Sequence, residues 1–295
     1  MKKRLLLGIF LLSLLVSCDK QKLPTFDGES AFSYLKAQCD FGPRIPGSKA
    51  HEKCKNYIVD VLESQGAKVT LQTFTASIRN KEYDFTNIIG SFYPEKKRRI
   101  FIGAHWDSRL WADKDQEETL WNEPVMGAND AASGVAVLLE LAKIFSEYEP
   151  SYGVDLLFFD AEDSGEYDVN KTWCLGSHYF VDKYDGTKPE YVIIVDMIGD
   201  TDLNILIESF SYRNSPALVN TIWDIAKKLG IKEFTTKMIN FIYDDHYPFL
   251  EAGYEAVVII DLDYPYWHTT HDTPDKCSPQ SLEKIGKVLV YLLYS

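Results

Sequence analysis

Short apolar runs that end in acidic or imidazole side chains constrain the fold of this chain most strongly. Three runs, 100–104, 156–159 and 191–195, lead into His105, Asp160 and Asp196. Runs of this length, separated by helical stretches, are typical of parallel strands buried on both faces. In open α/β sheets, ligands bind beyond the carboxyl ends of such strands. We therefore expect one sheet edge to gather six side chains, namely His105, Asp130, Glu162, Asp163, Asp196 and His268.

This mixture of carboxylates and imidazoles is what zinc binds in catalytic sites. Each member has a simpler interpretation when taken alone: Asp130 as a helix cap, His268 as a structural histidine among aromatic residues. The adjacent acids Glu162 and Asp163 could also form a solvated turn. Directly after an apolar run, however, they repel each other unless a cation or a shared proton offsets their charge. The ordered combination therefore favours a metal site.

The remaining apolar pattern predicts one domain. Helical spacing indicates helices over 51–65, 134–148 and 215–229, and a final helix capped by Ser278 with Pro279 at its first position. Further strands are expected over 69–74, 87–90, 203–208 and 256–261, the last two completing the central sheet. No repeat or linker interrupts this order. We predict an α/β fold, a single α/β/α domain over 26–295 with a mixed, mostly parallel central sheet.

The first residues have the pattern of an export signal. Three basic residues precede a 12-residue apolar stretch, Leu5–Val16, which is too short to span a bilayer. Leu15-Val16-Ser17-Cys18 resembles a bacterial lipobox, which implies cleavage before Cys18 and lipid attachment to its thiol; an ordinary secretory signal is the alternative. We expect a signal peptide over 1–17, a lipidated tether over 18–25, and an exported lipoprotein on a periplasmic or cell-surface face, touching the membrane only through its lipid.

The net charge and the cysteine pattern of the chain argue against two classes of function. The formal net charge is −13, and −16 without the leader's three basic residues, which argues against nucleic-acid binding. The four other cysteines (Cys39, Cys54, Cys174 and Cys277) form no C-x-x-C pair, which argues against a structural zinc finger. In an exported protein these cysteines can form disulfide bonds or remain free thiols, and the sequence does not distinguish between the two. We expect a monomer.

Several motifs resemble those of a known family. Five segments of this chain resemble motifs of the zinc aminopeptidase-like family M28: His105–Asp107, Gly127–Asp130, Glu162-Asp163, Asp196 and His268–Asp272. Four more segments resemble its glutaminyl-peptide cyclotransferase (glutaminyl cyclase) branch: Phe41–Ser48, Val195–Gly199, Asp244–Leu250 and Trp267–Thr269. The similarity extends from about Phe41 to the C-terminus.

The resemblance implies a zinc aminopeptidase-like (phosphorylase/hydrolase-like) fold and a specific chemistry. One zinc would be held by Asp130, Asp163 and His268, and Glu162 would be the general acid/base. Asp196 and Asp244 would share a hydrogen-bond network, and the substrate pocket would be lined by Trp267, with Trp173 and His246 also expected there. The enzyme would convert the N-terminal glutamine of peptides or proteins to pyroglutamate and release ammonia. Asp163 stands where animal members usually carry glutamate, so its shorter side chain must approach the metal more closely.

Two other functions fit parts of the pattern. In a two-zinc aminopeptidase, His105 and Asp196 would hold a second metal bridged through Asp130, and Glu162 would activate water. Trp267 before the histidine ligand and Asp244 before Asp-His favour the cyclase instead. A binding lipoprotein that kept the fold without activity is disfavoured by the intact Glu162, although fold alone does not exclude it. No G-x-S-x-G, P-loop or dinucleotide motif is present.

Overall fold

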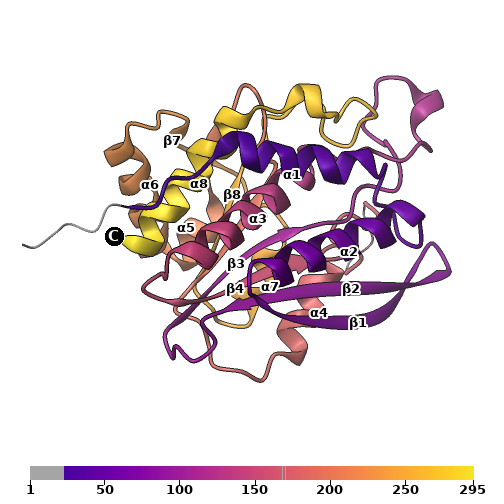
Figure 1. Ribbon diagram of the computed structural model, residues 1–295. Helices are drawn as coiled ribbons and strands as arrows, with labels where there is room; N and C mark the ends of the chain where they lie inside the picture. Colours follow the sequence, from indigo (N-terminus) through magenta and orange to yellow (C-terminus); the bar gives the residue numbers. More distant parts are fainter. Residues whose placement is uncertain (1–22, 168, 170) are drawn as a thin grey trace, which may run out of the picture.

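The computed structural model describes residues 23–167, 169 and 171–295, so the signal peptide and Cys18 lie outside the described residues. A six-stranded mixed sheet runs through the molecule (Figure 1). Its order is β1 (Lys68–Ile78), β2 (Lys81–Phe92), β4 (Gly153–Phe159), β3 (Arg99–His105), β5 (Val192–Asp196) and β8 (Ala256–Ile260). The last four strands are parallel, and β1 and β2 are antiparallel to their neighbours. The predicted mixed, mostly parallel sheet is confirmed.

The register of the parallel strands brings their carboxyl ends to one edge. His105, the last residue of β3, pairs with Phe159 at the end of β4. Asp196, the last residue of β5, pairs with Ile260 at the end of β8. The chain leaves all four strands at the same edge, so the polar residues beyond them are brought close together.

Helices cover both faces of the sheet (Figure 1). One apolar core includes buried residues of α1 (Gly28–Asp40), α2 (Lys49–Ser64), α3 (Ala132–Glu147), α6 (Pro216–Leu229) and α8 (Pro279–Tyr294). The core on the other face includes α4 (Leu175–Lys183) and α7 (His246–Glu251). Alternation within β3 separates the two cores, because Ile100 and Ile102 join the first and Phe101 joins the second. This is the three-layer α/β/α arrangement that the sequence predicts.

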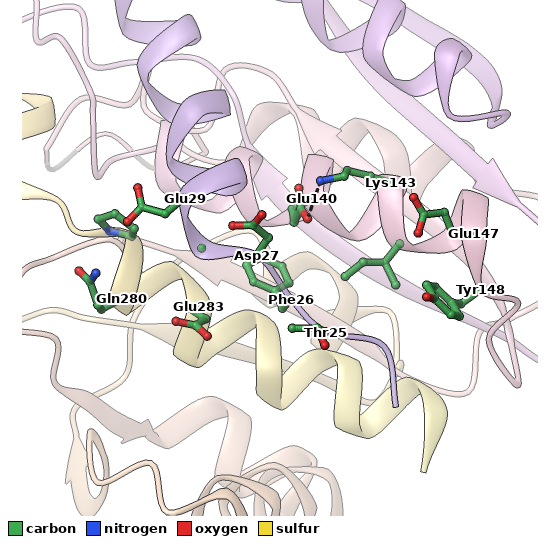
Figure 2. A pocket seen from close by; sticks show the side chains of 13 residues that line it. Thr25, Phe26, Asp27, Glu29, Glu140, Lys143, Glu147, Tyr148, Gln280 and Glu283 are labelled. Atoms are coloured by element: carbon green, nitrogen blue, oxygen red, sulfur yellow. Dashed lines mark hydrogen bonds and ion pairs between the residues drawn. The ribbon is translucent and has the colours of Figure 1, made fainter. Parts of the chain in front are cut away.

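The start of the described part of the chain is fixed by a close contact with α8. The Phe26 ring occupies the space beside Gly286, where a Cβ atom would approach it to 2.3 Å. Figure 2 shows the junction between the start of α1, α3 and α8, next to a surface cavity lined by acidic side chains that include Asp27, Glu140 and Glu283. Glycine at 286 therefore allows the first buried aromatic residue to dock against the last helix.

The prediction that 203–208 completes the central sheet is wrong. β6 (Ile205–Glu208) pairs with β7 (Phe234–Ile239) in a separate two-stranded parallel sheet. The edge of β8 is covered instead by α5 (Ser209–Asn214) and the residue after it. The backbone N–H groups of Ala256 and Val258 donate to Ser215 Oγ at 3.0 Å and Ser211 Oγ at 3.1 Å. Hydroxyl groups therefore satisfy an edge that a strand would otherwise pair with.

The predicted helices are confirmed to within a few residues at their ends, and Ser278 caps α8 by accepting a hydrogen bond from the Ser281 N–H. The elements that the sequence analysis did not predict are α1, α4, α5, α7, β7 and two 3₁₀ turns, Glu118–Leu120 and Pro274–Lys276. Among the described residues, no helix combines the length and apolar character needed to cross a membrane. Cys39, Cys54, Cys174 and Cys277 are all buried free thiols.

Candidate metal centre and active site

The predicted zinc ligands meet at the carboxyl edge of the sheet. His268 Nε2 lies 2.9 Å from Asp163 Oδ1 and 3.7 Å from Asp130 Oδ2, and all three side chains are buried. Ligands at about 2.0–2.1 Å from a tetrahedral zinc are themselves roughly 3.3 Å apart. The three donor atoms therefore have the spacing that one zinc ion requires.

A second donor set shares Asp130 with the first. His105 Nε2 lies 2.9 Å from Asp130 Oδ1 and 3.2 Å from Asp196 Oδ1. Asp130 thus presents one oxygen to each set, as a bridging carboxylate would. Ligand spacing alone is compatible with both the one-zinc cyclase and the two-zinc aminopeptidase.

Tight backbone turns place these side chains. His105 and Asp196 end their strands, Glu162 and Asp163 follow β4, and His268 lies in the loop after β8. Three non-glycine residues at these turns have positive φ: Ala161 at 58°, Met197 at 48° and His268 at 56°. Non-glycine residues rarely adopt this conformation, and they concentrate at functional sites. Asp130 is not a helix cap, because α3 begins after Ala131 without a side-chain cap.

Asp107 connects the turn after β4 to the end of β3. Its two oxygens accept hydrogen bonds from the backbone N–H groups of Glu162 and Asp163, each at 3.2 Å. Its Oδ1 also lies 3.3 Å from His105 Nδ1. Asp107 belongs to the motif His105–Asp107, but no role was predicted for it. Its position two residues beyond a strand end is the signal that could have identified it.

Asp272 fixes the loop that carries Asp130. It accepts hydrogen bonds from the backbone N–H groups of Asn129 at 2.8 Å and Asp130 at 3.1 Å, and from the Tyr264 hydroxyl at 2.6 Å. Groups of this kind hold ligands in the orientation that a metal needs. Asp272 belongs to the last motif of the family resemblance, but its buried acceptor role was not predicted.

Arg109 and Asp113 support the other side of the site. Arg109 donates to the backbone oxygen of Asp163 at 2.9 Å and pairs with Asp113 at 2.7 Å. Asp113 Oδ1 lies 3.5 Å from His268 Nδ1, and the Arg109 guanidinium lies 4.6 Å from the centre of the Trp173 ring. Arg109 follows β3, but neither residue belongs to one of the motifs, so no role was predicted for either of them.

The electrostatics of the site favour a cation. Burial opposes a charged imidazole, yet Asp163 and Asp113 raise the pKa of His268 to about 9. Likewise, hydrogen bonds donated to Asp107, Asp130 and Asp196 raise the pKa of His105 well above its ordinary value despite burial. Within the described part of the chain, Asp163 Oδ2 is buried and finds no hydrogen-bond partner. A site that stabilises positive charge and leaves a carboxylate oxygen unpaired suits a zinc ion.

The pKa values of the two adjacent acids are shifted in opposite directions. Burial raises the pKa of the Glu162 carboxyl well above its ordinary value, and the neighbouring Asp163 adds to this effect. Burial acts in the same direction on Asp163, but His268 and Arg109 hold its pKa below the ordinary value. Cys174 Sγ also donates to Glu162 Oε1 at 3.2 Å. Neighbouring acids with opposite pKa shifts are suited to separate roles, one as an ionised ligand and one as a proton carrier.

The predicted zinc ligands and other predicted site residues line one small cavity. It has a volume of about 70 Å³, and its walls include the three zinc ligands together with Glu162, Asp196, Asp244, Trp173 and Trp267. The Trp267 ring lies 4.0 Å from the His268 ring. Five of the predicted catalytic and pocket residues therefore face one space.

His246 does not line this cavity, which corrects the expectation that it belongs to the substrate pocket. It is completely buried at the start of α7, and its Nε2 lies 3.1 Å from Glu208 Oε2. Glu208, at the end of β6, supplies an internal carboxylate partner that the sequence pattern does not reveal. The imidazole therefore connects α7 to β6.

Comparisons with known proteins agree with this geometry. Residues 87–293 match the model of Peptidase family M28. Glutaminyl-peptide cyclotransferase of Bos taurus is 24% identical over 283 residues, covering 83% of this chain and 76% of the relative.

Two solved structures from Bacteroides thetaiotaomicron are similar to this chain. Each comparison covers 93% of this chain and 99% of the chain in the solved structure. A glutaminyl cyclase bound to N-acetylhistamine has 37% identity and a TM-score of 0.89. A protein described as a leucine aminopeptidase precursor has 38% identity and a TM-score of 0.90. The similarity thus extends over nearly the whole chain. It includes one protein described as a glutaminyl cyclase and one described as an aminopeptidase.

Proposed function

The chain belongs to peptidase family M28, and on this premise we propose that it is a glutaminyl cyclase that uses one zinc ion. Its substrates are peptides or proteins with an N-terminal glutamine, which it converts to pyroglutamyl products. The observation that carries the proposal is the single cavity shared by the three-ligand set, Glu162 and two tryptophans. Relatives and solved structures described as glutaminyl cyclases support it.

The cavity has the size of one side chain. A water-sized sphere takes about 10–15 Å³ by this kind of measure, so a volume of about 70 Å³ holds roughly five such spheres. The glutamine side chain has a comparable number of heavy atoms. Trp173 and Trp267 supply apolar walls, while the zinc ligands and Glu162 supply the polar end.

Zinc bound to Asp130, Asp163 and His268 would polarise the γ-carbonyl of the glutamine as a Lewis acid. Glu162 takes a proton from the α-amine as its nitrogen bonds to the carbonyl carbon of the side-chain amide (Cδ), and delivers a proton to the departing ammonia as the old bond between Cδ and the amide nitrogen breaks. Because the ring closure is intramolecular, the walls of the cavity contribute by positioning.

Asp196 and Asp244 both line the cavity and act together there. Burial raises the pKa of Asp244 well above its ordinary value, and the nearby Asp196 raises it further. A carboxyl group with its pKa raised in this way is suited to hold a proton near Asp196, as the hydrogen-bond network implied by the family resemblance requires. In this arrangement Asp196 takes part in the proton network rather than binding a second zinc ion.

The test compares two substrates with the same purified enzyme. A glutaminyl peptide should release ammonia and give a blocked N-terminus, while a leucine anilide should remain essentially uncleaved. The same peptide beginning with asparagine is the matched control, because ring closure would require a strained four-membered ring. Rapid removal of leucine, with no ammonia from the glutaminyl peptide, would assign the chain to the aminopeptidases.

We further propose that the enzyme is exported and anchored through lipid on Cys18. The support is the sequence alone: a basic start, a short apolar stretch and a lipobox-like Leu15–Cys18. Residues 18–25 would then join the lipid to a monomeric domain that begins at the buried Phe26. Such an anchor would place the active site on a periplasmic or cell-surface face, where peptide substrates are available.

A further inference from the structure

Exposed apolar side chains are concentrated beside the catalytic cavity. Eleven large hydrophobic residues are exposed in the described part of the chain, and five of them line one groove: Tyr167, Val169, Phe241, Tyr243 and Leu262. Phe241 is 55% exposed. Soluble proteins rarely gather apolar side chains in this way unless the surface binds something.

The groove is continuous with the catalytic cavity. Its volume is about 800 Å³, and it shares wall residues with the cavity: Trp173, Ile242, Tyr243, Leu262 and Trp267. A peptide with its first side chain in the small cavity has to continue into the space beyond these shared residues. The groove is therefore positioned to receive the substrate residues next to the terminal glutamine.

Aromatic packing holds the groove open. The Phe241 ring lies 4.4 Å from Phe210, which in turn lies 4.8 Å from Tyr247. Tyr247 also lies 4.8 Å from Tyr243. Neighbouring rings thus support these side chains before any ligand arrives, which lowers the entropy cost of binding.

We propose that this groove is a specificity subsite that binds apolar or aromatic side chains at the second and third positions of the substrate peptide. The inference rests on the proposed function, because it assumes a peptide whose terminal glutamine occupies the cavity. The occupant is a peptide rather than a second copy of this chain, since the groove opens into the space where the reaction takes place. Charged side chains such as Glu166, Lys171 and Glu251 also line the groove, but apolar and aromatic residues form most of its wall.

The experiment measures kcat/KM for two peptides that differ at one position, Gln-Phe-Ala-amide and Gln-Ser-Ala-amide. The wild type should favour the phenylalanine peptide roughly tenfold, mainly through KM, as expected for partial burial of an aromatic side chain. Phe241→Ser should reduce this preference to about twofold or less. Leu71→Ser is the matched control, because Leu71 is 49% exposed on β1 and lies outside the groove; it should keep the wild-type preference.

Binding of the two pyroglutamyl product peptides, measured by calorimetry, gives a second readout that needs no turnover. The phenylalanine product should bind about tenfold more tightly, and this difference should shrink in Phe241→Ser. Equal kcat/KM for the two substrates, or equal product affinities, would overturn the subsite. So would a stable dimer in sedimentation that Phe241→Ser dissociates, because the groove would then be an interface between copies. Absence of cyclisation with every glutaminyl peptide would instead refute the proposed function.

Discussion

The carboxylate of Asp107 accepts a hydrogen bond from the backbone N–H of Glu162 at 3.2 Å. The same side chain accepts the next N–H, that of Asp163, and lies 3.3 Å from His105 Nδ1. One buried carboxylate thus orients the turn that presents both the proton carrier and a metal ligand. Asp107 touches neither the metal-binding position nor the catalytic cavity, so its contribution is positioning.

Replacing Asp107 should weaken metal binding without removing a ligand. We expect Asp107→Ala to lower zinc affinity about 10–100-fold, the usual effect of losing a group that orients ligands. Competition with a fluorescent chelator measures the affinity, and circular dichroism checks folding. Asp185→Ala, on the exposed surface after α4, is the control and should bind zinc like the wild type. Wild-type affinity in Asp107→Ala would show that the turn is held without this carboxylate.

Substitutions of the adjacent acids Glu162 and Asp163 should separate loss of catalysis from loss of metal binding. Glu162→Gln should keep zinc and the folded state but lose at least about 100-fold in kcat, since general acid–base catalysis contributes that much. Asp163→Ala should instead lose the metal and, with it, the activity. Metal analysis and ammonia release, measured on the same samples, distinguish the two effects. Loss of zinc in Glu162→Gln would reassign that residue as a ligand.

The number of zinc ions tests the role of the second donor set. We expect one zinc per chain in the wild type and in His105→Ala, because Asp130, Asp163 and His268 complete the site without His105. Elemental analysis after dialysis against metal-free buffer gives the count. Two ions in the wild type, falling to one in His105→Ala, would support the two-zinc aminopeptidase.

The lipid anchor can be tested in the bacterial host. Cys18→Ser removes the thiol that would accept the lipid, so incorporation of a labelled fatty acid should be lost. The variant should appear as an uncleaved precursor or as a soluble secreted form. Cys39→Ser, which changes a buried thiol within the domain, should remain lipidated. Continued membrane association of Cys18→Ser after signal removal would argue against the lipobox.

Much of the fold can be predicted from local pattern. The strands that carry the site are continuous apolar runs buried on both faces, so their ends, and hence His105 and Asp196, are visible in the sequence. In α1 the buried apolar residues Ala31, Leu35 and Cys39 are few and four residues apart. That spacing gives a weak signal, and α1 is stabilised chiefly by packing on α3 and α8.

Other features depend on contacts between distant residues. A run such as 203–208 predicts a strand but does not identify its partner, and β7 is too exposed to show an alternating pattern. The family motif identifies His246 but cannot show that it faces Glu208 instead of the cavity. Among the metal ligands, Asp163 was predictable because it follows the apolar run of β4, whereas Asp130 and His268 lie in loops and were identified through the family motifs. The groups that hold them, such as Asp272 and Arg109, act across the fold and leave little local signal.

The source of the oxygen atoms in the product tests the central claim most directly. Cyclisation uses the substrate's own amine as the nucleophile, so it incorporates no oxygen from water. The reaction with a glutaminyl peptide is run in water enriched in heavy oxygen, and the product is analysed by mass spectrometry alongside released ammonia. Our account predicts one ammonia per pyroglutamyl peptide formed and no heavy oxygen in that peptide. Heavy oxygen in a side-chain carboxylate or in a released amino acid would show that the site activates water, and would contradict the account.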